Sequence, residues 1–150
     1  MSSWSIWKAT QIRYLDLFSG CGGFSLGLES SGAKLAFAIE RSGMAAETFM
    51  RNLVRPDMSD LEWLAYQELD TQRQMESGLV IGDIATVRGH SGVASALEEM
   101  ELDLVVGGPP CQGFSLAGRR NSNDRRNSLV WDFLDYVELA SPKFVIIENV

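Results

Sequence analysis

Apolar and polar positions alternate along this chain in two distinct ways. Short, nearly continuous apolar runs rich in β-branched and aromatic residues are typical of buried strands, whereas apolar residues recurring every three or four positions are typical of amphipathic helices. The runs predict strands at Ile12–Phe18, Lys34–Glu40, Leu79–Ile84, Leu102–Val106 and Lys143–Val150. The periodic segments predict helices at Phe24–Ser31, Met44–Leu53, Val93–Met100 and Ser128–Ala140, the last with Ser128 as its N-cap.

The stretch between the second and third predicted strands is longer and more polar than one crossover needs. Pro56 ends the helical pattern of the preceding segment, and Asp57–Met75 is polar but prone to form helix. Its helical stripe comprises Leu61, Leu64, Ala65 and Glu68. We therefore expect residues 56–78 to form an inserted helical segment.

The alternation of strands and helices places the chain in the α/β class, as a doubly wound, mostly parallel, Rossmann-like sheet. Its 150 residues, 45% of them hydrophobic, are enough for one domain and too few for two. Ligands of such sheets bind beyond the carboxyl ends of the strands. The residues of chemical interest that fall at these ends are Phe18, Glu40, Asp83, Cys111 and Glu148.

Charge and composition narrow the class of protein further. A net charge of −7 argues against a chain whose whole surface binds nucleic acid, although one basic cluster comprises Arg119, Arg120, Arg125 and Arg126. The two cysteines lie far apart and no Cys/His ligand set accompanies them, so we expect neither a disulfide framework nor a metal site. Neither a signal peptide nor an apolar run of membrane-spanning length is evident, which favours a cytoplasmic protein without membrane contact.

The run Gly107–Ser115, with the sequence Gly-Gly-Pro-Pro-Cys-Gln-Gly-Phe-Ser, follows the fourth predicted strand directly. Pro109 and Pro110 restrict the backbone ahead of Cys111, and the flanking glycines let a substrate approach the chain. A buried structural cysteine needs none of these neighbours, whereas a nucleophile at the end of a sheet does, so we interpret Cys111 as a nucleophile. The lone histidine, His90, lies in a loop far from these motifs, so a cysteine–histidine protease would lack its base.

A glycine-rich turn follows the first predicted strand. Residues 16–24 depart from the dinucleotide pattern Gly-x-Gly-x-x-Gly because Ser25 stands at the third glycine, and a generic tight turn is the alternative. Glu40, about 20 residues further on, suits ribose hydroxyls, and Asp83 suits an adenine amino group unless it is only an exposed strand end. The two carboxylates, without a lysine or arginine for phosphates, favour a nucleoside without pyrophosphate. S-adenosylmethionine fits, with its sulfonium near Phe18, and NAD fits less well.

Taken in order, these motifs resemble those of the DNA (cytosine-5) methyltransferases. The resemblance covers Tyr14 to Val150 and rests on Asp16–Ser25, Glu40, Gly82-Asp83-Ile84, Gly107–Ser115 and Glu148-Asn149-Val150. It implies the fold of the S-adenosylmethionine-dependent methyltransferases, S-adenosylmethionine as cofactor, and double-stranded DNA with a flipped cytosine as substrate. It also implies a bacterial restriction–modification setting, with association to the nucleoid when the protein acts on DNA.

The resemblance also implies roles for single residues. In this family a cysteine thiolate, here Cys111, adds to C6 of cytosine, while a protonated carboxyl group, here Glu148, hydrogen-bonds N3. Asn149 would orient the cysteine loop, C5 would take the methyl group, and loss of the C5 proton would expel the cysteine. The implied cofactor-binding residues are Asp16, Phe18, Ser19, Gly20, Gly22, Gly23, Phe24, Glu40, Asp83, Ile84 and Pro109. The implied DNA contacts, in a loop that closes over DNA, are Gln112, Ser115, Arg119 and Arg120.

The chain departs from the family pattern in two respects. Arg41 stands where an apolar or aromatic residue often lies against the adenine, and the segment between Glu40 and Asp83 is long. The family's arginine-bearing strand, target-recognition domain and returning C-terminal segment are expected to be absent after Val150, which would leave Phe144–Ile147 as an uncovered apolar edge. We expect one incomplete catalytic domain that needs a complementing C-terminal polypeptide. The alternatives are an inactive fragment or split-subunit module that binds a nucleoside or a partner protein, and an NAD-dependent oxidoreductase.

Overall fold

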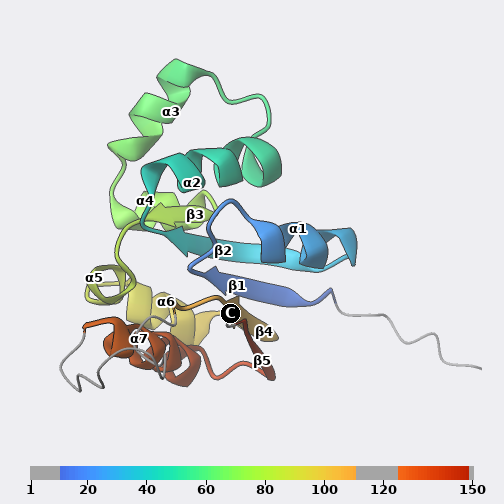
Figure 1. The fold of residues 1–150 in the computed structure, drawn as a ribbon, viewed down its shortest axis with the longest axis vertical. Coiled ribbons are helices and arrows are strands. Elements are labelled where there is room, and N and C mark those ends of the chain that lie inside the picture. Colours follow the sequence, from blue (N-terminus) through green and yellow to red (C-terminus); the bar gives the residue numbers. More distant parts are fainter. Residues whose placement is uncertain (1–10, 111–124, 149–150) are drawn as a thin grey trace, which may run out of the picture.

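Five parallel strands form one sheet in the computed structural model, which describes residues 11–110 and 125–148. The strands are β1 (Arg13–Leu17), β2 (Lys34–Glu40), β3 (Leu79–Ile81), β4 (Leu104–Gly107) and β5 (Phe144–Ile147). Their order is β3-β2-β1-β4-β5, so the first strand lies at the centre and the last at an edge (Figure 1). All four pairings are parallel, which confirms the predicted doubly wound α/β sheet.

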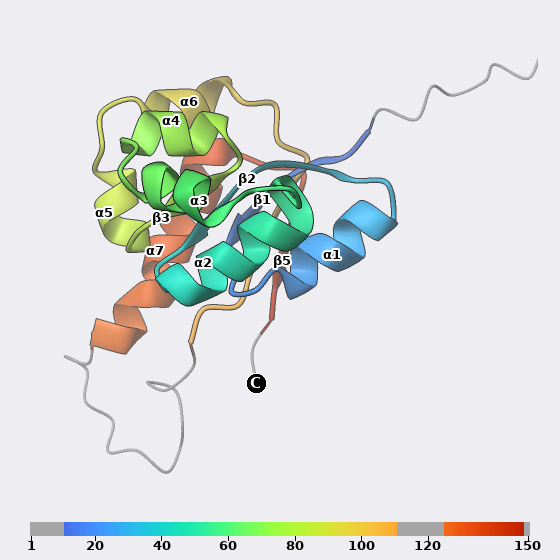
Figure 2. The same cartoon turned by 90° about the horizontal axis from the view of Figure 1, so that it is seen from above.

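Helices cover both faces of this sheet. They are α1 (Gly23–Ser30), α2 (Gly43–Phe49), the π-helical turn η1 (Met50–Val54), α3 (Asp60–Gln67), α4 (Thr71–Glu76), α5 (Ile84–Arg88), α6 (Val93–Glu99) and α7 (Arg125–Ala140). Helices α1 and α2 lie on one side of the sheet, and α5, α6 and α7 lie on the other (Figures 1 and 2). Helix α4 lies beside β3, and α3 is the outermost element beyond α2 (Figure 1).

Burial on both faces explains why the strands have nearly continuous apolar sequences. Leu15 and Leu17 of β1 join the cluster that faces α5, α6 and α7, which includes Phe133 and Tyr136 of α7. Tyr14 lies in the cluster on the opposite face, packed by the apolar side of α1. A strand with helices on both sides shows no polar–apolar alternation, because neither face meets water.

The end of β3 differs from the prediction. The strand stops at Ile81 rather than continuing to Ile84, and Asp83 begins helix α5 as its N-cap. The Asp83 carboxylate accepts hydrogen bonds from the amides of Ala85 and Thr86, which satisfies backbone donors that a helix start leaves without partners. Similarly, the predicted helix Met44–Leu53 is an α-helix only up to Phe49 and widens into η1.

The predicted stripe of α3 is wrong. Leu61 and Leu64 are 80% and 59% exposed, whereas Trp63 and Tyr66 form the buried side of the helix. The two aromatic rings stack with centroids 5.8 Å apart, and the Tyr66 hydroxyl donates a hydrogen bond to the carbonyl of Leu79 in β3. Burial of two large aromatic side chains removes more apolar area from water than burial of two leucines, so the helix turns that side inward.

The last helix and strand also have different bounds from those predicted. Helix α7 begins at Arg125, so Ser128 lies inside its first turn and the prediction that it is the N-cap is wrong. Strand β5 spans Phe144–Ile147 and is shorter than the predicted Lys143–Val150. Its four residues are between 40% and 67% exposed, and among the described residues it pairs only with β4. Over the described ranges, the structure holds no helix that is both long and apolar enough to cross a membrane.

Candidate functional site

A cavity of about 270 Å³ opens at the carboxyl ends of the strands. Its lining comes from the end of β2, from the segments that follow β1, β2, β3 and β4, and from α7. It comprises Phe18, Ile39, Glu40, Arg41, Gly82, Asp83, Ile84, Gly108, Pro110 and Leu129. Two carboxylates, one guanidinium and several apolar side chains therefore share one concave surface. Such a mixture is typical of a site for a small organic ligand.

The glycine turn, Ser19–Gly23, connects β1 to α1 beside this cavity. Phe18, just before it, has φ +58°, and Gly20 and Gly22 have φ +55° and +94°. A positive φ is unfavourable for phenylalanine, so the surrounding structure must stabilise this backbone conformation. At Gly22, where φ is +94°, a side chain would be strained, and its Cβ would overlap the Leu53 side chain and lie 2.9 Å from the Phe49 ring.

Glu40, the last residue of β2, connects the glycine turn to the start of α2. Its Oε2 accepts a hydrogen bond from the Gly20 amide at 2.8 Å, and its Oε1 accepts one from the Ser42 amide at 2.7 Å. Each carboxylate oxygen has two lone pairs, so each can still accept one further hydrogen bond. The carboxylate is thus fixed in place and retains acceptor capacity toward the cavity.

Asp83 has a similar double role at the end of β3. Its Oδ1 accepts from the amides of Ala85 and Thr86 at 3.2 and 3.4 Å. Among the hydrogen bonds of the described residues, none reaches Oδ2, and the residue lines the cavity. Gly82 before it must lack a side chain, because an added Cβ would lie 2.8 Å from Val87.

Asp16 lies behind the glycine turn and is completely buried. The Ser25 hydroxyl donates to its Oδ2 at 2.6 Å, while its Oδ1 and the Ser19 hydroxyl oxygen have no partner among the described residues. Burial raises the pKa of Asp16 to about 6, since removal from water disfavours the charged carboxylate. Within the described part of the chain, two buried polar atoms at the tip of β1 thus have no hydrogen-bond partner.

Gly108, which follows β4, and Glu148, which follows β5, lie next to each other. The Glu148 amide donates to the Gly107 carbonyl at 3.0 Å. A Cβ on Gly108 would lie only 3.2 Å from Glu148 Oε2, so the carboxylate lies directly against the chain as it leaves β4. At Gly107 an added Cβ would overlap the Leu17 carbonyl oxygen and contact Phe133, which explains the glycine at this position.

A sequence model of the family "C-5 cytosine-specific DNA methylase" matches residues 12–75 and 67–150 of this chain. The two matched ranges together cover most of the chain and include every segment that lines the cavity. The chain belongs to this family.

Curated relatives of this chain include bacterial type II methyltransferases. Over 93% of its length it is 37% identical to M.DdeI of Desulfomicrobium norvegicum and 32% identical to M.HgiGI of Herpetosiphon aurantiacus. It spans only 28% to 48% of the first three relatives, M.DdeI, M1.HphI and M.AquIA, but 90% of M.HgiGI.

Solved structures agree with this assignment. A prophage-encoded DNA modification methyltransferase of E. coli superposes with a TM-score of 0.65 at 30% identity, over 93% of this chain and 32% of that one. The Dnmt2 methyltransferase of S. pombe superposes with a TM-score of 0.60 at 20% identity, which shows a shared fold. The doubly wound sheet described above is therefore the methyltransferase fold.

The structure brings only part of the predicted cofactor site to the cavity wall. Phe18, Glu40, Asp83 and Ile84 line the cavity together. The turn residues Ser19, Gly20, Gly22 and Gly23 lie beside it, and Asp16 is buried behind them. Phe24 packs into the cluster on the α1 face of the sheet, and Pro109 is buried. Their contact with a cofactor stays a prediction.

Several predicted residues lie outside the described part of the chain. These are Cys111, Gln112, Ser115, Arg119, Arg120 and Asn149.

Sequence reasoning also missed cavity residues. Four of them are direct sequence neighbours of predicted residues, namely Ile39, Gly82, Gly108 and Pro110. They could have been predicted, because ligands of parallel sheets bind beyond the carboxyl ends of the strands. Leu129 has no such signal, because it reaches the cavity only through the packing of α7.

Proposed function

We propose that this chain is the cofactor-binding and nucleophile-bearing portion of a DNA cytosine-5 methyltransferase that uses S-adenosylmethionine. The observation that carries the proposal is the cavity at the strand ends, where Glu40 and Asp83 present acceptor oxygens within a family-matched segment. Among the described lining residues two carboxylates face a single guanidinium, that of Arg41, and this negative balance favours a nucleoside over a dinucleotide with its pyrophosphate.

The donor set of the site fits S-adenosylmethionine. The remaining lone pairs of the Glu40 carboxylate suit two ribose hydroxyls, and Asp83 Oδ2 suits an adenine amino group. The ring of Phe18 suits a sulfonium. Asp16 Oδ1 and Ser19 Oγ, which have no partner among the described residues, lie at the tip of β1, where a polar or cationic group would satisfy them. When bound, S-adenosylmethionine supplies the methyl group that C5 of cytosine takes.

The chain's own residues activate the cytosine. The Cys111 thiolate forms a bond to C6, and the electron pair displaced from the ring double bond makes C5 nucleophilic. Glu148 donates a proton or hydrogen bond to N3, which stabilises the developing charge. Loss of the C5 proton then returns the electron pair, and the bond to Cys111 breaks. Glu148 lies against Gly108, because these two residues directly follow the neighbouring strands β5 and β4. This position supports the joint action of Glu148 and Cys111 on one base.

The target cytosine reaches this site only when it is flipped out of the duplex. Asn149 orients the loop that carries Cys111. We propose that Gln112, Ser115, Arg119 and Arg120 contact the DNA, with the arginines on phosphates, while the protein is at the nucleoid. The exposed apolar strand β5 and the partial coverage of the relatives support completion by further C-terminal segments, either in one polypeptide or in a second one.

A calorimetric titration of the chain with S-adenosylmethionine tests the cofactor site. Wild type is expected to bind. Glu40→Gln is expected to bind more weakly, because an amide NH2 replaces one acceptor oxygen and faces an N–H donor. Absence of heat with wild type, or equal affinity in the variant, would contradict the assigned site. Binding of NAD in place of S-adenosylmethionine would favour an oxidoreductase.

Methyl transfer to duplex DNA, with a C-terminal polypeptide from a relative added, tests the chemistry. Cys111→Ser is expected to abolish transfer while still binding S-adenosylmethionine, which separates loss of the nucleophile from loss of folding. DNA with 5-fluorocytosine should trap a covalent complex with wild type, since fluorine cannot leave as the C5 proton does. Retained transfer in Cys111→Ser would refute the mechanism. Cofactor or partner binding without any transfer would favour the split-subunit or inactive module.

A further inference from the structure

The glycine turn is supported from behind by the π-helical turn η1. Leu53 of η1 and Phe49, the last residue of α2, are the side chains that press against Gly22. A π-helical turn is rare and is commonly found next to functional sites. Any movement of η1 would therefore change the space in which the glycine turn must fit.

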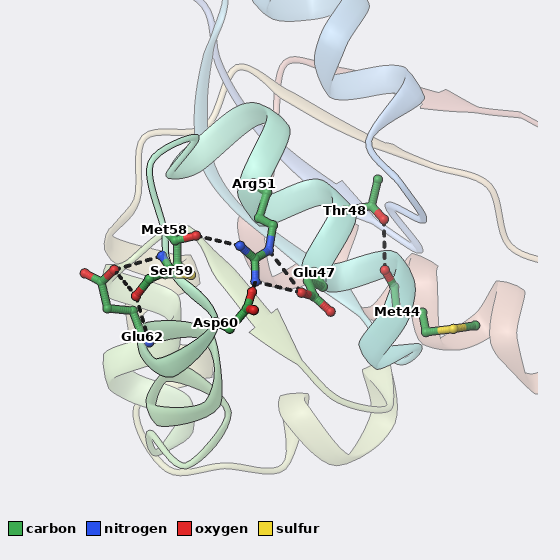
Figure 3. Close-up of polar contacts among 8 residues, drawn as sticks. All are labelled: Met44, Glu47, Thr48, Arg51, Met58, Ser59, Asp60 and Glu62. Carbon is green, nitrogen blue, oxygen red and sulfur yellow. Dashed lines mark hydrogen bonds and ion pairs between the residues drawn. The ribbon is translucent and has the colours of Figure 1, made fainter.

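Arg51 is the second residue of η1 and connects this turn to three other points (Figure 3). Its Nε donates to Glu47 Oε1 at 3.0 Å, its Nη1 donates to the Met58 carbonyl at 2.6 Å, and its Nη2 donates to Asp60 Oδ1 at 2.6 Å. The side chain is only 28% exposed, so water competes less for these bonds than at an open surface. Charge-assisted hydrogen bonds of this kind are the stronger ones in proteins.

The start of α3, which Arg51 contacts through Asp60, is held by hydrogen bonds of its own. Ser59 and Glu62 form a capping box at the start of α3, in which Glu62 Oε2 accepts from both the Ser59 amide and its hydroxyl (Figure 3). The hydrogen bond from the Ser59 amide is the main reason that the pKa of Glu62 is lowered. Beyond the cap, Tyr66 is buried and its hydroxyl donates to the Leu79 carbonyl of β3. Arg51 thus ties η1 to a helix that is fixed on the sheet.

We propose that Arg51 is a positioning residue for the glycine turn, and that residues 55–62 fix the turn through it. The physical link runs from the α3 cap through the Arg51 guanidinium to η1, and from Leu53 to Gly22. The segment between η1 and β3 therefore sets the shape of the glycine turn through side chains that do not line the cavity. The expected consequence for cofactor affinity rests on the proposed function, whereas the effect on the turn itself does not.

The test compares Arg51→Met with Arg55→Met. Both variants keep an unbranched side chain and remove one positive charge. Arg55 also pairs with α3, through Glu62 at 2.9 Å, but it follows η1 instead of lying within it. Amide hydrogen exchange at Gly20 and Gly22 is measured in the free chain, because both amides are hydrogen-bonded there. Calorimetry then gives the affinity for S-adenosylmethionine, and thermal unfolding gives the stability.

Arg51→Met is expected to speed exchange of the two amides and to weaken cofactor binding by about fivefold, as for residues that act through neighbours. Arg55→Met is expected to change stability alone. Equal exchange and affinity in Arg51→Met and wild type would overturn the proposal, and so would equal effects of the two variants. If wild type binds no S-adenosylmethionine, the proposed function fails while the exchange data still decide the role of Arg51.

Asp60→Asn serves where Arg51→Met does not fold. It weakens one of the three Arg51 contacts at an exposed side chain and is expected to give a smaller change of exchange in the same direction. Unchanged exchange at Gly20 and Gly22 in that variant would overturn the proposal.

Discussion

Replacement of Asp16 by asparagine should change how the stability of the chain depends on pH. The Asp16 side chain is completely buried, and its one hydrogen bond among the described residues comes from Ser25 at 2.6 Å. Burial raises its pKa from 3.8 to about 6 in the folded chain. Asparagine has nearly the same shape and can still accept the Ser25 hydrogen bond, but it carries no charge at any pH.

The raised pKa means that the folded chain holds a proton which the unfolded chain loses more readily. The stability contributed by protonated Asp16 is fully present below about pH 3.8 and is lost as pH rises to about 6. At 1.36 kcal/mol for each pKa unit, the difference between 3.8 and about 6 corresponds to roughly 3 kcal/mol. Wild type should therefore lose about this much unfolding free energy relative to Asp16→Asn across the interval.

Urea unfolding of both proteins at a series of pH values between 4 and about 7.5 measures this difference. Other titrating groups are common to both chains and cancel when one free energy is subtracted from the other. A difference that stays constant over the interval would refute the reasoning, because it would place the titration of Asp16 in the folded chain near that in the unfolded one.

Four further substitutions test packing and the sheet edge. Gly107→Ala should lower the free energy of unfolding in urea by about 2 to 3 kcal/mol. The control Gly27→Ala, at an exposed position inside α1, should raise it by about 0.5 to 1 kcal/mol. Equal effects of the two variants would contradict the close approach of Gly107 to the Leu17 carbonyl oxygen. Tyr136→Phe removes the buried hydrogen bond to the Ile84 carbonyl and should cost about 1 to 2 kcal/mol, so an unchanged melting temperature would argue against that bond. Ile146→Lys on β5 should reduce concentration-dependent association in sedimentation, and undiminished association would mean that another surface is responsible.

Much of the fold could be predicted because each buried parallel strand is recognisable by itself. The course of β1 and β2 follows from apolar runs that turns interrupt. The five-residue helix α5 is too short to show a periodic pattern of apolar residues. The capping residue Asp83 is its one indication in the sequence. In α3 both sides of the helix carry apolar residues, so the choice of Trp63 over Leu61 depends on the tertiary partners of the helix.

The site was predictable to the extent that topology alone determines it. Phe18, Glu40 and Asp83 lie at or just beyond the carboxyl ends of separate strands, and a parallel sheet brings such ends together. The double hydrogen bonding of Glu40 was not predictable, because it depends on the exact course of two turns. The link from Arg51 to the glycine turn was equally hidden, since it joins residues that no sequence motif connects.

The central position of β1 also determines the order in which the sheet can be completed during synthesis. Strand β1 is made first and soon gains β2 as a neighbour, but its other neighbour is β4, which pairs Leu104 with Tyr14 across 90 residues of chain. Such distant pairing is slow because a long loop must close first. We therefore expect β3, β2 and β1 to assemble before β4 and β5 dock. A nascent chain that pauses before Leu104 would expose the middle of its own sheet to the ribosome surface and to chaperones.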